Sequence, residues 1–200
     1  MNYTAVYAAL IPDAGEIGDV LPEERQAEID RCSSPKVKRE KYYVWKLLEY
    51  AFERDLGERL ENISFEKNGN GKWTSDKAFF SLSHTDGVVA VAVSGSNVGV
   101  DVEAVRRHRD GLEAHILTER ERAELSDLED SAAWEYIIGR WTQKESIFKT
   151  FNDRGFEPKR IEASEYPTRT ERLALPVGVY MLSVCAQDVD NVRIEIVDPF

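Results

Sequence analysis

The stretch FFSLSHTDGVVAVAVSGSNVGVDVE, residues 79–103, decides the fold that we expect for this chain. It holds three short segments rich in β-branched and aromatic residues, separated by turn-forming residues: 79–83, 88–93 and 98–102. Such a series is typical of consecutive β-strands. In the last segment Val100 and Val102 alternate with Asp101 and Glu103, and residues i and i+2 of a strand face the same way. We therefore expect a strand with its valines in the core and two carboxylates side by side on its other face.

The residues before this stretch predict one strand and two helices. A β-branched and aromatic run at residues 3–10 is a candidate strand. Pro22, followed by two glutamates, is typical of a first helical turn. After Pro35 an apolar stripe at three- to five-residue spacing predicts a second helix, which Gly57 ends. The Asn and Gly residues at positions 68–71 indicate a turn.

The residues after the stretch predict two further helices and three strands. Thr118 and Glu121 have the capping-box spacing of a helix that runs through Leu125. Ser131 is a candidate N-cap for a longer helix through Thr150. Three segments close the chain as candidate strands: 161–166, 179–186 and 192–197.

The length and the order of elements indicate the domain organisation. The chain has 200 residues, which suits one large domain or two lobes of about 100 residues each. Each half combines helices with several strands, so we expect an α+β fold of two similar α/β lobes in one chain. The expected lobes are residues 1–97 and residues 98–200, and the second lobe carries the candidate metal site.

The composition predicts a soluble protein of a reducing compartment. Hydrophobic residues make up 42% of the chain and charged residues 32%, as in ordinary globular domains. Continuous hydrophobic runs such as residues 88–93 are far too short for a membrane helix, and the first residues lack a signal-peptide pattern. Cys32 and Cys185 stand far apart, without zinc-site or disulfide-framework spacing. We therefore expect a cytoplasmic protein with no membrane partner.

The charge argues against a nucleic-acid partner. The chain carries 26 basic and 37 acidic side chains, for a net charge of −11. Nucleic-acid binding requires a cationic surface that displaces counterions from phosphates. A few clustered lysines and arginines still form a local positive site on an acidic protein. The balance therefore favours small molecules or proteins as ligands.

The acidic strand is a candidate metal site. Asp101 and Glu103 repel each other when they lie side by side, and a hard divalent cation relieves that repulsion. Magnesium binds one to three carboxylates and keeps positions open for water and substrate phosphate. The alternative is a half-exposed edge strand with two solvated acids, which is common in proteins.

The helix predicted to end near Thr150 holds a second candidate group. Trp141, Glu145 and Lys149 are spaced i, i+4 and i+8, along one face of a helix. Glu145 could complete a set of three carboxylates or act as a general base, and Lys149 could neutralise a phosphate. The alternative is an ordinary Glu–Lys pair on a solvated face, which stabilises a helix by about 0.3 kcal/mol.

Several polar or basic segments are candidate anion sites. Ser83 and His84 stand at the end of a strand, where side-chain and backbone donors can hold an anion. The alternative for this segment is a turn that satisfies its own backbone. A basic run before the apolar stripe could clamp a phosphate or be the solvated side of a helix: Lys36, Lys38, Arg39 and Lys41. The basic residues at 106–109 could bind an anion or a protein, or form a solvated loop.

In combination, these motifs resemble those of the 4′-phosphopantetheinyl transferase superfamily. The order is Ser83-His84, then Gly99-Val100-Asp101-Val102-Glu103, then Trp141-Thr142-Gln143-Lys144-Glu145 with Lys149 four residues further on. The family pattern is a Ser-His turn, a G-[IV]-D-[IV]-E strand and a W-x-x-K-E-[AS]-x-x-K helix about 40 residues later. A chain of this length with both halves present resembles the Sfp-type branch, in which one chain forms a pseudo-dimer of two lobes.

The resemblance implies an enzyme that transfers the phosphopantetheine arm of coenzyme A to a serine of an apo acyl or peptidyl carrier protein. It implies that Mg²⁺ is required and that 3′,5′-ADP is released. Asp101, Glu103 and Glu145 would hold the metal, and Glu145 would also accept the proton of the carrier serine. Lys149 would offset charge on the phosphates.

The resemblance also implies residues that bind coenzyme A. Ser83 and His84 would contact the phosphates, and Gly71-Lys72 would lie near the adenine. One basic residue would hold the 3′-phosphate: Lys36, Lys38, Arg39 or Lys41. The sequence departs from the family after Lys72, where Trp73 replaces the usual proline.

Two other functions compete with this interpretation. One is a degenerate family member that binds coenzyme A or a carrier without transfer, although the three carboxylates and Lys149 are all present. The other is a metal-dependent nuclease, which the net charge disfavours. We expect a monomer that acts on a carrier protein.

Overall fold

The computed structural model describes residues 3–13, 17–18, 22–107, 111–151 and 155–200. The helices and strands in chain order are β1 (Thr4–Leu10), α1 (Glu23–Asp30), α2 (Pro35–Leu56), η1 (Leu60–Asn62), β2 (Phe65–Lys67), β3 (Trp73–Ser75), β4 (Phe79–Thr85), β5 (Val88–Ser94), β6 (Val98–Ala104), α3 (Leu112–Ile116), α4 (Glu119–Leu125), α5 (Asp130–Phe151), η2 (Pro158–Arg160), η3 (Ala163–Glu165), β7 (Thr168–Leu175), β8 (Gly178–Ala186) and β9 (Val192–Val197). The fold is mixed α+β, as the sequence predicts.

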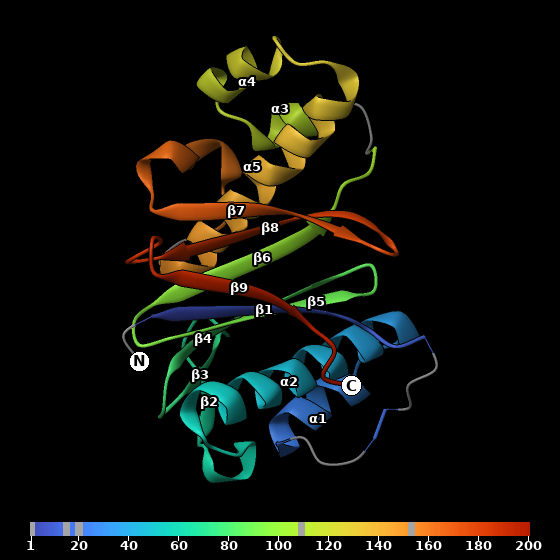
Figure 1. The fold of residues 1–200 in the computed structure, drawn as a ribbon, viewed down its shortest axis with the longest axis vertical. Coiled ribbons are helices and arrows are strands. Elements are labelled where there is room, and N and C mark those ends of the chain that lie inside the picture. Colours follow the sequence, from blue (N-terminus) through green and yellow to red (C-terminus); the bar gives the residue numbers. More distant parts are fainter. Residues whose placement is uncertain (1–2, 14–16, 19–21, 108–110, 152–154) are drawn as a thin grey trace.

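Two sheets and two long helices form four layers. One sheet has the strand order β4-β5-β1-β9, and another has the order β6-β8-β7. In Figure 1 the two sheets lie one above the other, with α2 below the first and α5 above the second. The strands β2 and β3 form a separate two-stranded hairpin beside the first sheet. The short helices α3 and α4 lie beyond the N-terminal half of α5.

Apolar faces of the two sheets pack against each other. The three valines of β6, Val98, Val100 and Val102, are fully buried in a cluster with Val88 of β5 and Leu182 of β8. This confirms the prediction that the valines of β6 face the core. The opposite face of β6 is therefore the one that meets α5 and carries Asp101 and Glu103.

The ends of α2 follow from local sequence. The side chain of Ser34 accepts a hydrogen bond from the backbone N–H of Val37 at 3.4 Å, and Pro35 occupies the first helical position, where its missing N–H costs nothing. Gly57 ends the helix in the left-handed conformation, with φ 68°. The predicted second helix is therefore confirmed at both ends.

The predicted caps of the later helices are confirmed in one case and shifted in the other. Thr118 and Glu121 form a full capping box at the start of α4. Helix α5 begins at Asp130, so Ser131 lies inside the helix rather than before it. The helix continues to Phe151, one residue beyond the predicted end.

The strand predicted at residues 161–166 is wrong. That segment follows the 3₁₀ turn η2 and contains η3, and the strand comes later, as β7. Among the described strands β7 pairs only with β8, and it is polar along most of its length, as an edge strand can be. The apolar pattern that marks a buried strand is therefore missing from its sequence. The predicted strands at 179–186 and 192–197 are confirmed.

The last strand joins the sheet of the N-terminal half. Strand β9 pairs in parallel with β1, from Thr4 opposite Val192 to Ala9 opposite Val197. A buried carboxylate ties the same elements together: Asp55 of α2 accepts hydrogen bonds from Tyr7 of β1 at 2.8 Å and from Arg193 of β9 at 2.8 Å. Strand β9, which the predicted boundary between residues 97 and 98 assigns to the second lobe, therefore belongs to the sheet of the first.

Two further observations concern the cysteines and the hydropathy of the helices. Both cysteines are free thiols, with Cys185 buried and Cys32 half-buried. Among the described residues, none of the helices has the length and hydropathy that a membrane span requires.

Candidate active site

A close contact between α5 and β6 builds the centre of the site. A Cβ atom at Gly99 would lie 2.0 Å from the carbonyl oxygen of Ser146 and 2.6 Å from Oγ1 of Thr150. Only glycine leaves room for the helix at this separation. The close approach brings Glu145 and Lys149 of α5 over the face of β6 that carries Asp101.

Asp101 is the best-anchored carboxylate of the site. Its Oδ1 atom accepts hydrogen bonds from Nζ of Lys149 at 2.7 Å and from Oγ of Ser83 at 2.8 Å. Its Oδ2 atom is buried and has no hydrogen-bond partner among the described residues. A buried carboxylate oxygen without a donor is costly unless a ligand or a cation completes it.

Alternate residues of β4 supply hydroxyls to the edge of β6. Ser81 accepts a hydrogen bond from the backbone N–H of Val100 at 3.0 Å, and Ser83 accepts one from Val102 at 3.2 Å. Thr85, the next residue on this face, donates to Oε2 of Glu103 at 2.8 Å. These side chains replace a backbone ladder between β4 and β6. Ser83, predicted from the sequence as a phosphate contact, has its hydroxyl between the two sheets.

Burial and mutual repulsion disfavour the ionised forms of two carboxylates. The pKa of Glu103 is raised to about 7 because the carboxyl is buried and lies near Asp101. The pKa of Glu145 is raised by burial and by Asp101, against the opposing effect of Lys149. Clusters of acids whose charges are incompletely compensated are typical of functional sites.

A basic cavity of about 350 Å³ lies beside these carboxylates. Five basic side chains line it, and no acidic residue is present among its described lining residues. The basic lining residues are Arg25, Lys41, Lys72, His84 and Lys149. On a chain with a net charge of −11, helices α1, α2 and α5, together with Lys72, supply four basic residues other than His84 here, which makes the cavity a local anion site.

Lys72 fixes the wall between the cavity and α5. Its Nζ atom donates to the carbonyl oxygen of Lys149 at 2.7 Å and to that of Val98 at 3.2 Å. The pKa of Lys72 is lowered to about 8 because the ammonium group is buried and lies near Lys149. Gly71 also lines the cavity, so the predicted Gly71-Lys72 pair does meet the other basic residues here.

His84 is neutral at physiological pH. Burial and the surrounding cations, Lys149 first among them, lower its pKa to about 4. Its Nδ1 atom lies 3.2 Å from Oε2 of Glu40, a buried residue of α2. The imidazole therefore offers the cavity hydrogen bonding rather than charge.

Arg25 of α1 is a member of the cavity that the sequence did not reveal. Its guanidinium donates to the carbonyl oxygen of Lys41 at 2.6 Å and to Glu28 at 2.9 Å, and lies 5.2 Å from the ring centre of Trp45. Burial lowers its pKa to about 10, and its Nε atom has no partner among the described residues. The signal available was an arginine in the first turn of an amphipathic helix, which is too common to identify a site.

Only one residue of the predicted basic run reaches the cavity. Lys41 lines it, whereas Arg39 donates to the carbonyl oxygens of Pro12 and Asp13. Lys36 forms ion pairs with Asp86 and Glu40, and Lys38 is not among the residues that line the cavity. The helical periodicity of α2 explains this division, because the residues of the run point in different directions around the helix.

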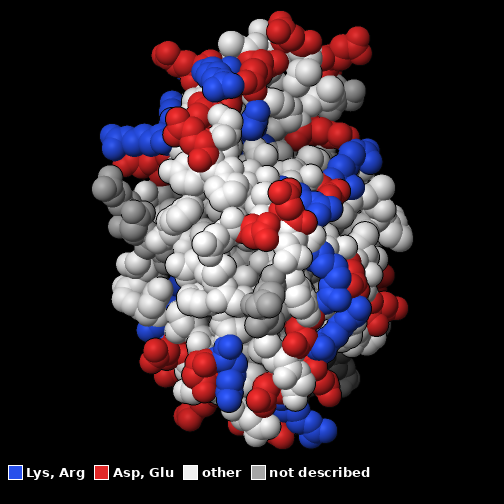
Figure 2. Space-filling model, turned by 60° about the vertical axis from the view of Figure 1, so that its left-hand side comes forward, with Lys and Arg blue, Asp and Glu red and all other residues white. Residues whose placement is uncertain are grey.

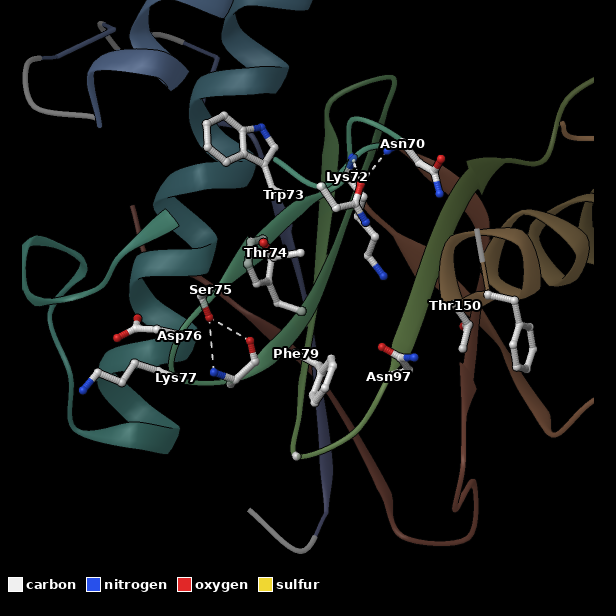
Figure 3. A pocket seen from close by; sticks show the side chains of 15 residues that line it. Asn70, Lys72, Trp73, Thr74, Ser75, Asp76, Lys77, Phe79, Asn97 and Thr150 are labelled. Carbon is white, nitrogen blue, oxygen red and sulfur yellow. Dashed lines mark hydrogen bonds between the residues drawn. The ribbon is translucent and has the colours of Figure 1, made fainter. Parts of the chain in front are cut away.

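A second cavity of about 440 Å³ lies on the other side of Lys72. Figure 3 shows Lys72 reaching into the space between the segment that carries Trp73 and the side chains of Asn97 and Thr150. Asn70, Lys72, Trp73 and Phe80 line both cavities. The two cavities therefore share one wall.

One face of the molecule carries charges of both signs. On the face shown in Figure 2, acidic and basic side chains mix at the upper and lower ends and along the right-hand side, and the centre and left of the middle region carry few charges. This face offers no broad cationic surface for a nucleic-acid backbone.

The fold and the site define a mixed α+β protein with an anion cavity beside buried carboxylates, and the comparison with known families agrees. The sequence profile of the 4′-phosphopantetheinyl transferase superfamily matches residues 97–196, which include β6 and α5. The chain therefore belongs to the 4′-phosphopantetheinyl transferase superfamily.

A more particular similarity is to a single transferase. The 4′-phosphopantetheinyl transferase gsp of Aneurinibacillus migulanus is 30% identical over 99 residues. The matched stretch makes up 49% of this chain and 42% of that relative, so the similarity spans less than half of the relative's length.

Proposed function

We propose that this protein transfers the 4′-phosphopantetheine arm of coenzyme A to a serine of an apo acyl or peptidyl carrier protein, with Mg²⁺, and releases 3′,5′-ADP. One observation carries the proposal beyond family membership. The basic cavity, with no acidic residue among its described lining residues, lies directly beside Asp101 and Glu145. Lys149 belongs to both, since it lines the cavity and binds Asp101.

The cavity cations would bind the phosphates of coenzyme A. Arg25 and Lys41, from α1 and α2, are the candidates for the 3′-phosphate, because both line the cavity while Lys36, Lys38 and Arg39 do not. A guanidinium can bind a phosphate through two parallel hydrogen bonds, and Arg25 would exchange its hydrogen bonds to Glu28 and to the carbonyl oxygen of Lys41 for them. His84 would add a neutral hydrogen bond.

The adenine would lie against the segment that carries Gly71. Gly71 has a φ of +77°, and a Cβ atom there would meet nothing within 4 Å. Trp73 lines the same cavity and supplies the aromatic surface in place of the proline usual in the family. Its indole N–H is held by Glu28 at 3.3 Å.

Magnesium would be held by Asp101, Glu103 and Glu145. The donor set fits the metal in kind, since all three ligands are carboxylates and one oxygen of Asp101 is buried without a partner among the described residues. Within the described part of the chain, no three potential ligands are gathered as a ready metal site. When bound, magnesium supplies positive charge that offsets the charge of the pyrophosphate.

Glu145 would accept the proton of the carrier serine. A serine hydroxyl is a weak nucleophile until a base is placed on it. The raised pKa of Glu145 makes it a stronger base than an exposed glutamate. Lys149 would hold Asp101 in place and lower the barrier to departure of 3′,5′-ADP by offsetting its charge.

The proposal includes the arrangement of the whole molecule. The pairing of α2 with one sheet and of α5 with the other supports two similar lobes, with the cavity at the seam where β4 meets β6. We propose a cytoplasmic monomer that meets its carrier protein at the open side of this seam.

Intact-mass spectrometry of an apo carrier protein tests the proposed function. The carrier is incubated with coenzyme A, Mg²⁺ and this protein, and the expected result is a mass gain of one phosphopantetheine group that chelation of the metal prevents. Coenzyme A binding without any mass gain on acyl and peptidyl carriers would support the degenerate binder instead. Absence of both would contradict the proposal.

A further inference from the structure

The turn between β4 and β5 places a carboxylate between two cations from other elements. Asp86 forms ion pairs with Lys36 of α2 and with Arg106, which follows β6. The three residues come from segments that are 50 and 20 residues apart in sequence, so the pairing depends on the tertiary fold.

The backbone of this turn is held firmly. Asp86 has a φ of +32°, in the left-handed region that few residues other than glycine, asparagine and aspartate adopt. The hydroxyl of Tyr180, from β8, donates to the backbone carbonyl of Asp86 at 3.0 Å. The backbone at Asp86 is therefore tied to β8 through Tyr180.

The ion pairs lie between the basic cavity and the acidic end of β6. On one side, Lys36 lies 3.8 Å from Glu40, which contacts His84 of the cavity. On the other side, Thr85 binds Glu103, and the charge of Asp86 contributes to the raised pKa of Glu103. We call Lys36, Asp86 and Arg106 the mouth cluster.

The two cations of the mouth cluster are open to solvent, and the carboxylate is not. The side chains of Lys36 and Arg106 are 61% and 60% exposed, whereas that of Asp86 is 23% exposed. A phosphate group is an acceptor of the same kind as the carboxylate. A phosphate that approached Lys36 and Arg106 would therefore compete with the carboxylate of Asp86 for them.

We propose that Asp86 is a specificity-determining residue that competes with a phosphate of the coenzyme for Lys36 and Arg106. While Asp86 occupies these two cations, the phosphates of the coenzyme bind the cations of the cavity instead. The inference rests on the proposed function and deepens it. It predicts that loss of the Asp86 charge opens a second phosphate contact at the mouth and tightens coenzyme binding.

Calorimetric titration of coenzyme A into Asp86→Asn tests the inference. Asparagine tolerates the same backbone conformation and removes one charge. We expect binding about two- to fivefold tighter than in the wild type, the size typical of partly exposed ion pairs. The control is Asp127→Asn, an exposed aspartate in the turn after α4, which makes the same change of net charge and should leave binding unchanged.

A second variant tests whether the tighter binding comes from the two cations that Asp86 releases. Adding Lys36→Gln to Asp86→Asn should remove most of the gain, because one of the two freed cations is then absent. Equal or weaker binding by a folded Asp86→Asn, or a gain that survives Lys36→Gln and Arg106→Gln together, would overturn the inference.

The choice of ligand identifies which phosphate reaches the mouth. A gain with coenzyme A that vanishes with 3′-dephospho-coenzyme A assigns the contact to the 3′-phosphate, and a gain with both assigns it to the pyrophosphate. A wild-type protein that binds neither ligand would instead contradict the proposed function. Wild-type binding with no change in Asp86→Asn overturns this inference alone.

Discussion

The two long helices cover their sheets with very different surfaces. Helix α2 meets the first sheet through large apolar side chains, with the rings of Trp45 and Phe52 lying 6.3 Å and 5.8 Å from that of Phe80 in β4. Helix α5 meets the second sheet through small and polar groups. Thr142 and Ser183 share a hydrogen bond of 2.8 Å, and Gly99 lies directly against α5.

The difference shows how one fold separates stability from chemistry. Aromatic packing removes a large apolar area from water and keeps the layers apart by the width of the rings. Hydroxyls and glycine allow the other helix to approach closely, which brings carboxylates and an ammonium group together where water is scarce. The altered pKa values of Glu103 and Glu145 are the result.

The largest expected effect comes from the polar interface. Glu145→Gln should lower the transfer rate by about 10²- to 10⁴-fold, the usual contribution of a positioned general base, while coenzyme A still binds. The rate is followed as the mass gain of the carrier. The matched control is Glu135→Gln, an acid on the same helix that pairs with Arg172 at 3.0 Å outside the site. A wild-type rate in Glu145→Gln would remove this residue from the chemistry.

The apolar interface should respond in stability instead. Phe52→Ala deletes a fully buried ring and should lower the free energy of unfolding by about 3–5 kcal/mol, measured by urea denaturation. Where the variant remains folded, its affinity for coenzyme A should match that of the wild type. A change in the affinity for coenzyme A that exceeds the spread of repeated wild-type measurements would show that the two interfaces are coupled.

Two glycines of the polar interface give a sharper contrast. Gly99→Ala forces backbone atoms apart and should lower the free energy of unfolding by about 1–3 kcal/mol, with a slower transfer. Gly139→Ala in α5 meets only the end of Met181 at 3.4 Å and should raise the free energy of unfolding by about 0.5–1 kcal/mol. Thermal melts of both variants measure the difference. Equal effects would contradict the close-packing account of the site.

The last prediction concerns the dependence of stability on pH. The folded protein holds the pKa of His84 at about 4, below its ordinary value of 6.5, so between these values the unfolded chain binds a proton that the folded chain does not. The free energy of unfolding of the wild type, relative to His84→Gln, should therefore fall as the pH drops from 6.5 to 4. Denaturation curves across this range provide the test, and parallel pH profiles would contradict the lowered pKa.

The polar interface was also the more predictable one. Asp101 and Glu103 are identified by alternation with buried valines, and Glu145 and Lys149 by helical spacing, because both elements are regular and local. Gly99 in the same strand was part of the motif, although its contact with Ser146 is a tertiary property.

The basic cavity was harder to predict because tertiary structure assembles it. Arg25 and Lys41 lie on separate helices, and only the packing of α1 on α2 brings them together. Four basic residues lie close together in the sequence of α2, and the direction of each side chain around the helix decides that Lys41 lines the cavity. The role of Asp86 depends on partners from two other segments.

The sequence also fails where strands lie at an edge. Strand β7 and the hairpin of β2 and β3 are short or polar, and their pairing depends on neighbours rather than on a local apolar pattern. The segment at 161–166 holds one β-branched residue, Ile161, and buries Ala163 in a 3₁₀ turn rather than forming a strand.

The most direct test of the account is the ratio of 3′,5′-ADP released to carrier serine modified. Chromatography of the nucleotide and intact mass of the carrier are measured in one reaction that contains wild-type protein, coenzyme A and Mg²⁺. The account predicts one 3′,5′-ADP for each phosphopantetheine group on the carrier and none without the carrier. Release of 3′,5′-ADP in the absence of carrier, or no release in its presence, would contradict transfer.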